Sequence, residues 1–351
     1  MQRLLLAASA WWCRLLTSVW SRLPGLLLTC TIAAAAFALR GLSGIAVLSP
    51  PIIAIALGIA FHNAVDTPAM FKPGVVFSMR RILRVGIVLL GLQLSLAQAV
   101  TVGTVGVVII AATLAATFAF TVWLGRRLGM ERKLAELIGA GTSICGASAI
   151  IATNTVTSAS EEDVAYAVAC VTVLGSVSAL LYPALGDFLQ LMPHEFGLWA
   201  GASIHEIAQV VAAAFQNGPD AGNFGTIAKL CRVMLLAPMI MVLSYSRAKR
   251  RQISDSAHVK PWIMRAAPMP WFVLGFIAMM LVNSLDVIPP AKKIYLIQAT
   301  TFLLTVALAA MGFETDFAKL REKGWKPLLL GAGSWLFISA LSLALIELVY
   351  N

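Results

Sequence analysis

The sequence predicts an all-α polytopic membrane protein with about eleven transmembrane segments. Of its 351 residues, 60% are apolar and only 12% are charged. The apolar runs recur at lengths of about 17 to 25 residues, which a helix needs to cross the hydrocarbon core of a bilayer. Two pairs of segments also resemble each other, which predicts an internal duplication.

The apolar runs place the expected transmembrane segments in order along the chain. They cover roughly residues 24 to 40, 45 to 61, 83 to 99, 102 to 124, 134 to 157, 162 to 186, 195 to 216, 223 to 245, 268 to 286, 294 to 313 and 327 to 349. Before them, residues 1–22 set arginines against leucines and tryptophans, which predicts an amphipathic helix in the membrane interface. A cleaved signal peptide would need a longer apolar core before its small residues. Residues 23–351 then form one transmembrane domain.

Two Gly-rich polar stretches interrupt the apolar runs at membrane depth. They read GAGTSICGASAIIATNT (139–155) and GASIHEIAQVVAAAF (201–215), and placing Gly141 on Gly201 also aligns Ser143 with Ser203. A second match aligns residues 83–96 with residues 304–317; it places Gly91 on Gly312 and, further along, Gly103 on Gly324. The two matches together predict that the two halves of the protein share a structure.

Basic residues gather in short connections between the apolar runs, and they set the expected orientation. They precede the third segment (Arg80, Arg81, Arg84), follow the fourth (Arg126, Arg127, Arg132, Lys133) and the eighth (Arg247, Lys249, Arg250, Arg251), and separate the last two (Lys319, Arg321, Lys323, Lys326). All fall on the cytoplasmic side if the N-terminus is cytoplasmic and the C-terminus periplasmic. Topology therefore explains the net charge of +10 better than nucleic-acid binding does.

This orientation makes residues 83–96 and 304–317 run in opposite directions, as in an inverted repeat. The two Gly-rich stretches are parallel by simple counting, and they become inverted if segments 134–157 and 195–216 are each a helical hairpin or a broken helix pair. Charge does not decide between these alternatives, because both leave the basic connections on the same side. Irregular backbone at this depth is tolerated only where it is buried in protein or lines a wet cavity.

Three stretches resemble a known family: GAGTSICGASAIIATNTVTSASEEDVAYAVACVTV, GASIHEIAQVV and GTIAKLCRVMLLAP. They are similar to the YeiH-like family of bacterial conserved hypothetical inner-membrane proteins, whose other name refers to sulfate export. The resemblance runs from about Ser49 to the C-terminus. A more distant similarity, to bile-acid:sodium symporters, matches Gly146 to Asn154 and Glu206 to Gln209 with their two broken-helix motifs. It implies an inverted-repeat transporter that works by alternating access, although Gly-Ala-Ser-Ala departs from the symporter pattern.

The first Gly-rich stretch offers polar oxygens beside its glycines. Thr142, Ser143, Ser148 and Asn154 are the candidate binding residues there, and Ser203 is the candidate in the second stretch. A helix break exposes backbone N–H groups that attract anions and carbonyl groups that suit sodium. The alternative is that these small residues only pack helices together in lipid.

His205, Glu206 and Gln209 lie inside an apolar run and are the candidate ion-coupling residues. An acid at the bilayer centre costs about 3 kcal/mol or more, so Glu206 needs a partner, a proton or a wet pathway. The alternative is a structural pair with His205. Gln209 stands where the His-Glu-x-x-His zinc motif needs its second histidine, and no metal site is predicted.

Lys229 and Arg232 are three residues apart, so they share one face of a helix. Lys229 could snorkel to an interface, whereas Arg232 lies deeper in the apolar run. Two buried cations favour an anionic substrate; the alternative is that they neutralise Glu206 or Glu314. Gln93, Glu314 and Asp316 are secondary candidates.

These features together predict a secondary active transporter of a small anion of the sulfate, sulfonate or carboxylate type, coupled to Na⁺ or H⁺. Broken helices and charges near the midplane of an inverted-repeat fold are typical of such transporters. An anion channel and a non-transporting membrane sensor or scaffold are the alternatives. The chain shows no nucleotide-binding loop and no nucleophile set, so we expect no enzyme, no cofactor and no nucleic-acid partner. We expect the protein to lie in the inner membrane of a bacterium. The sequence leaves open whether it forms a homodimer.

Overall fold

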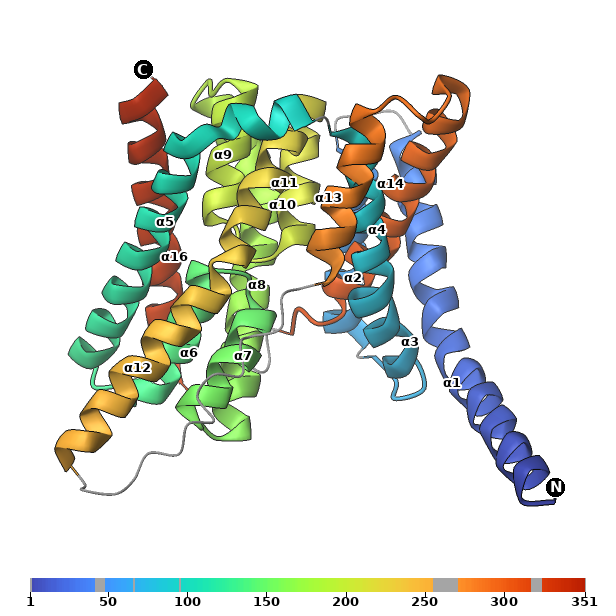
Figure 1. Cartoon of the computed structure of the whole chain (residues 1–351), viewed down its shortest axis with the longest axis horizontal. Coiled ribbons are helices and arrows are strands. Elements are labelled where there is room, and N and C mark those ends of the chain that lie inside the picture. The colour runs from blue at the N-terminus through green and yellow to red at the C-terminus, as the bar shows by residue number, and fades with distance from the viewer. Residues whose placement is uncertain are drawn as a thin grey trace. The chain divides into compact units, whose positions relative to one another are not determined.

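The computed structural model describes residues 2–41, 48–65, 67–94, 96–254, 271–316 and 324–350, and every regular element in these ranges is a helix (Figure 1). Within these described residues, six helical stretches are long and apolar enough to cross a membrane: Trp20–Arg40, Val105–Arg127, Glu161–Phe188, Pro219–Arg247, Ala291–Gly312 and Trp325–Val349. Three shorter apolar helices accompany them in the same ranges. The all-helical membrane class is therefore confirmed, whereas the count of eleven spans stays a prediction.

The chain divides into two compact units. Unit 1 contains α1 (Gln2–Arg40), α2 (Pro50–Val65), α3 (Lys72–Phe77), a π-helical turn η1 (Ser78–Ile82), α4 (Leu83–Leu90) and α14 (Pro290–Gly312). Small residues let its helices approach closely, because a Cβ atom on Gly58 of α2 would lie 2.4 Å from the carbonyl oxygen of Ala309 on α14. The expected boundary at residue 22 falls within α1, so an interfacial role for residues 1–22 stays a prediction.

Unit 2 contains the remaining helices that the structure describes. They are η2 (Gly91–Gln93), α5 (Leu96–Arg127), α6 (Arg132–Ser143), α7 (Ala147–Thr157), α8 (Glu161–Phe188), α9 (Pro193–Ser203), α10 (Ile207–Gln216), α11 (Pro219–Met234), α12 (Leu236–Ser254), α13 (Trp271–Ser284) and α16 (Trp325–Tyr350). The expected third span, 83 to 99, is not one helix, because α4 ends at Leu90 and the backbone is extended at Leu94 before α5 begins.

The first Gly-rich stretch forms a helical hairpin, α6 and α7. The chain turns at Ile144, Cys145 and Gly146, and the end of α7 returns to the beginning of α6, where Lys133 Nζ donates a hydrogen bond to the carbonyl oxygen of Ser158 at 2.9 Å. Gly146 has a φ of 65°, a left-handed conformation that an L side chain rarely adopts. This glycine permits the turn into α7.

The second stretch forms another hairpin, α9 and α10, with its turn at Ile204, His205 and Glu206. The end of α10 returns to the end of α8, just before α9 begins, because Asn217 Nδ2 donates a hydrogen bond to Asp187 Oδ1 at 3.0 Å. Segments 134–157 and 195–216 are therefore both hairpins, which the sequence left open.

The two hairpins enter unit 2 from opposite ends. Between the end of the first and the start of the second lies α8, whose 28 residues span about 42 Å at 1.5 Å per residue. In Figure 1, α6 and α7 lie in the lower half of unit 2, and α9 and α10 lie in the upper half. The tips of the two hairpins consequently point toward each other.

Candidate functional site

The tips of the two hairpins touch. We define the tips as Ile144, Cys145 and Gly146 in the first hairpin and Ile204, His205 and Glu206 in the second. A Cβ atom on Gly146 would lie 2.6 Å from Glu206 Cγ and 2.8 Å from Glu206 Oε1. Glycine is therefore required at position 146 both for its backbone conformation and for the approach of Glu206.

Lys229 of α11 bonds both tips at once. Its Nζ donates to the carbonyl oxygen of Ile144 at 2.6 Å and to that of Ile204 at 2.7 Å. The side chain is fully buried, so Lys229 does not snorkel to an interface, which was one expectation from the sequence.

Arg232, one turn further along α11, is also buried and also joins the hairpins. It donates from Nε to Ser143 O (3.1 Å) and from Nη2 to Thr142 O (2.7 Å), both at the end of α6. Its Nη1 donates to Gly201 O (3.1 Å) and Ile204 O (3.0 Å), at the end of α9. Arg232 and Lys229 thus cap the carboxyl ends of two helices from different hairpins.

This arrangement has a clear physical cause. The last carbonyl groups of a helix lack partners within the helix and carry a partial negative charge. At the end of a hairpin inside a membrane protein these groups cannot reach bulk water, so cationic side chains satisfy them. From the sequence, a bound anion or an acidic side chain was the expected partner of the two cations. In the structure, backbone carbonyl oxygens accept their hydrogen bonds.

Glu206 and Gln209 form a capping box at the start of α10. The side chain of Glu206 accepts a hydrogen bond from the backbone N–H of Gln209, and Gln209 Oε1 accepts one from the backbone N–H of Glu206 at 3.1 Å. Gln209 Nε2 also donates to Thr172 O on α8 at 3.2 Å. A negative charge on Glu206 is favourable here, because the helix amino terminus is electropositive.

Several buried polar atoms around the tips have no hydrogen-bond partner among the residues that the structure describes. They are both ring nitrogens of His205, the hydroxyl of Thr142 and the hydroxyl of Ser143, and all three residues are fully buried. Such atoms destabilise a fold by about 1 to 3 kcal/mol each, and they commonly mark a place where a ligand, ion or water is bound.

The other predicted residues are more dispersed. Ser203 donates its hydroxyl to Trp199 O at 2.5 Å, and Ser148 is exposed on the first turn of α7. Asn154 lies near the far end of α7, about 12 Å along the helix from the tip, where its Oδ1 accepts from the backbone N–H of Ala159 at 2.8 Å. Gln93 lies in η2, and Glu314 and Asp316 follow α14.

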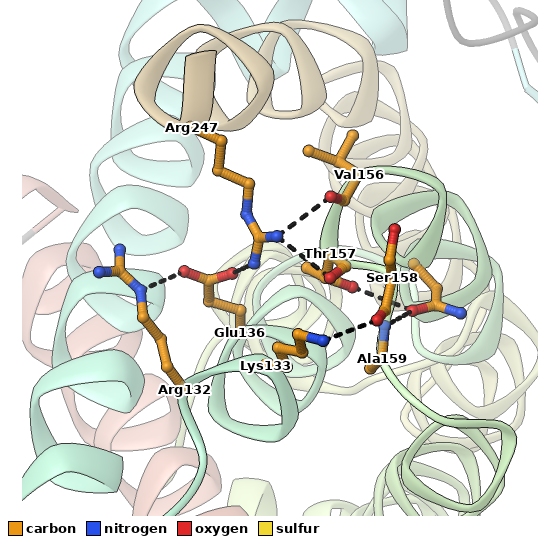
Figure 2. A network of polar contacts seen from close by, with 9 residues as sticks. Arg132, Lys133, Glu136, Val156, Thr157, Ser158, Ala159 and Arg247 are labelled. Carbon is orange, nitrogen blue, oxygen red and sulfur yellow. Dashed lines mark hydrogen bonds and ion pairs between the residues drawn. The ribbon is translucent and has the colours of Figure 1, made fainter. Parts of the chain in front are cut away.

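A polar network lies at the open end of the first hairpin (Figure 2). We did not predict it from the sequence. Buried Glu136 of α6 accepts from Arg132 Nε at 2.7 Å and from Nη2 of Arg247 on α12. Arg247 Nη1 also donates to Val156 O and Thr157 O, each at 3.1 Å, at the end of α7. The four-residue spacing of Arg132 and Glu136 on one helix was the available signal.

Comparison with known proteins identifies the family. Residues 24–331 match the family model described as conserved hypothetical protein 698. The chain belongs to this family. It is 40% identical over 357 residues to the UPF0324 membrane protein PA5383 of Pseudomonas aeruginosa, covering 94% of this chain and 97% of that protein.

Two further relatives carry the name UPF0324 inner membrane protein YeiH. The protein from Salmonella typhi is 37% identical and that from Escherichia coli K12 is 36% identical, each over 332 residues that cover 92% of this chain and 93% of the relative. With the apolar helices, these names support a multi-pass inner-membrane protein. The resemblance to the YeiH-like family is confirmed.

Proposed function

We propose that this protein is a secondary active transporter of a small anion that works by alternating access. The observation that carries the proposal is the meeting of two helical hairpins, entered from opposite ends, around the buried Lys229 and Arg232. Substrate sites of secondary transporters lie where interrupted helices of two repeats meet near the bilayer midplane.

An inverted repeat is part of this proposal. Gly103 and Gly324, which align in the sequence, both have positive φ (60° and 80°), and each precedes a long apolar helix. These two helices run antiparallel in unit 2: Phe120 stacks on Phe337 at 4.1 Å between ring centroids, while Gly125 lies beside Leu330. Opposite directions of matched elements support an inverted relation between them.

The charge balance at the tips favours an anion. Two helices end and two begin there, so their partial charges of about −0.5 and +0.5 offset one another. Lys229 and Arg232 then outweigh an ionised Glu206 by about one charge. Each cation also retains one N–H group beyond the hydrogen bonds described, since a lysine has three donors and an arginine five. Protonation of Glu206 would add a second positive charge, which would couple a proton to a divalent anion.

The orientation proposed for unit 2 follows from its charged ends. Arg126, Arg132, Arg247 and Lys326 gather at the end where the first hairpin opens, which we call the basic end, and Asp187 and Glu195 lie at the other. The positive-inside rule makes the basic end cytoplasmic, and α16, which starts there, then carries the C-terminus to the periplasm. Reporter fusions at Asn351 and residue 260 test this; signals from the same side would refute it.

The transport proposal is tested with purified protein in proteoliposomes. Sulfate, an alkyl sulfonate and a dicarboxylate are first screened for stabilisation of the protein at several pH values, with and without sodium. We expect at least one anion to raise the unfolding temperature and to show saturable uptake that is accelerated by the same anion inside the vesicle. Uptake without such counterflow would indicate a channel, and neither binding nor flux would refute transport of these anions.

A further inference from the structure

A second candidate binding site lies away from the tips, in a groove on unit 2. Its volume is about 560 Å³, and residues of α5, α6 and α12 line it, with Leu235 of the bend before α12. Most of the wall is apolar and includes Ala111, Leu114 and Phe118 of α5 and Met239 of α12. The volume lies in the range of pockets that bind small ligands.

The groove has the length of one membrane leaflet. Along α5 it extends from Ala111 to Arg126, a rise of about 22 Å at 1.5 Å per residue. Half of a hydrocarbon core is about 15 Å thick. The groove therefore covers the depth of the acyl chains in the leaflet at the basic end and reaches the level of the headgroups.

Two arginines line the groove at the headgroup level. Arg126 is exposed, and no hydrogen bond or ion pair engages its side chain within the described part of the chain. Arg132 has a side chain that is 40% exposed, and its hydrogen bond to Glu136 uses only Nε. The guanidinium nitrogens that remain can donate to phosphate oxygens, for which arginine is well suited.

We propose that this groove binds an anionic glycerophospholipid, with its phosphate at Arg126 and Arg132 and one acyl chain along α5 and α12. A zwitterionic lipid would place a second cation beside the arginines, and a soluble anion would leave the apolar wall uncovered. Basic pockets between transmembrane helices on the cytoplasmic side commonly hold anionic lipid headgroups.

The position of Arg132 connects this lipid to the first hairpin. Arg132 shares Glu136 with Arg247, and Arg247 holds the end of α7 through two backbone carbonyl groups (Figure 2). A phosphate at Arg132 lies within the ion-pair network that fastens the hairpin to α12. The lipid therefore stabilises the folded protein at its basic end.

The test compares phosphatidylglycerol with phosphatidylcholine of the same acyl chains, each added to the purified full-length protein in detergent. Native mass spectrometry and thermal unfolding report binding. We expect phosphatidylglycerol to bind at least about tenfold more tightly than phosphatidylcholine. Arg126→Gln should reduce this preference about tenfold, as expected for the loss of one charge-assisted hydrogen bond. Lys326→Gln is the matched control, because it removes a charge at the same end from outside the groove.

A second pair of variants tests the acyl-chain site. Ala115 is exposed in the groove, so Ala115→Phe fills the groove without entering the core, whereas exposed Ala112 lies outside it and Ala112→Phe serves as the control. We expect only Ala115→Phe to release the bound lipid. Any of three results would overturn the proposal: equal binding of both lipids, full lipid binding by Ala115→Phe, or equal stabilisation by glycerol phosphate without acyl chains. A second copy of the chain covering the groove, seen as a dimer that Ala115→Phe dissociates, would overturn it as well.

Discussion

At both the hairpin tips and the basic end, cationic side chains cap the ends of helices, but their partners and their burial differ. At the tips, Arg232 caps the end of α6; about 22 Å further along the same span, Arg247 caps the end of α7. At the basic end the carboxylate of Glu136 bonds directly to Arg247. At the tips the cations bond to backbone carbonyls, and both are fully buried.

This difference separates a structural ion-pair network from the anion site that we propose at the tips. Glu136 pairs directly with both Arg132 and Arg247, so it holds one hairpin to α12, and the two arginine side chains there are 40% and 24% exposed. At the tips the two cations are fully buried and lie beside polar atoms that have no partner in the described part of the chain. A site for a small anion should have buried polar groups of this kind, because the ligand supplies their missing partner.

Arg232→Gln should have the largest effect on stability. The substitution leaves carbonyl groups of two helices without donors, and we expect a loss of about 3 to 5 kcal/mol in the free energy of unfolding, as when one partner of a buried charged network is removed. Thermal unfolding in detergent measures it. A variant as stable as the unmodified protein, but unable to bind anions, would show that substrate and not the hairpins is the main partner of Arg232.

Arg247→Gln should have a smaller effect, about 1 to 3 kcal/mol, because Arg132 still pairs with Glu136 and the site is partly exposed. In a double-mutant cycle with Glu136→Gln, the loss in the double variant should be smaller than the sum of the two single losses, because both variants remove the same ion pair. Anion affinity should stay unchanged. A fall in affinity as large as that caused by changes at the tips would contradict the distinction between the two regions.

Glu206→Gln should change coupling more than stability. The amide keeps the shape of the side chain and still accepts a hydrogen bond from the backbone of Gln209, so we expect a loss of no more than about 1 kcal/mol. Transport should lose its dependence on pH or on sodium, whichever ion is coupled. Unchanged rates and ion dependence in proteoliposomes would leave Glu206 with only its capping role.

Thr142→Val and Ser143→Ala should have the smallest effect on stability. Their hydroxyls are buried without partners in the described structure, so their removal should be neutral or stabilising by up to about 1 kcal/mol. If these hydroxyls bind the anion, affinity should fall about tenfold while the unfolding temperature without substrate stays the same or rises. Thr113→Val is the control, because it also removes a buried hydroxyl without a described partner but lies on α5, outside both hairpins. Wild-type affinity in both tip variants would exclude their hydroxyls from the site.

Hydropathy and glycine patterns located the main features from the sequence alone. The apolar runs predicted a helical membrane protein, because a helix satisfies its own backbone hydrogen bonds in lipid. The paired Gly-rich stretches located both hairpins, and the spacing of Lys229 and Arg232 placed them on one helical face. These are local properties, readable within a few helical turns.

The tertiary structure alone decided which groups these residues contact. Lys229 and Arg232 reach carbonyl groups at the end of α6 and in the turn after it, 85 to 90 residues earlier in the chain, and Arg247 reaches Glu136 over 111 residues. Every residue carries a backbone carbonyl, so no side-chain pattern marks the ones that a cation will bind. Only the opposing entry of the hairpins exposes two sets of these carbonyls to one face of α11, and this packing gives the buried cations their partners.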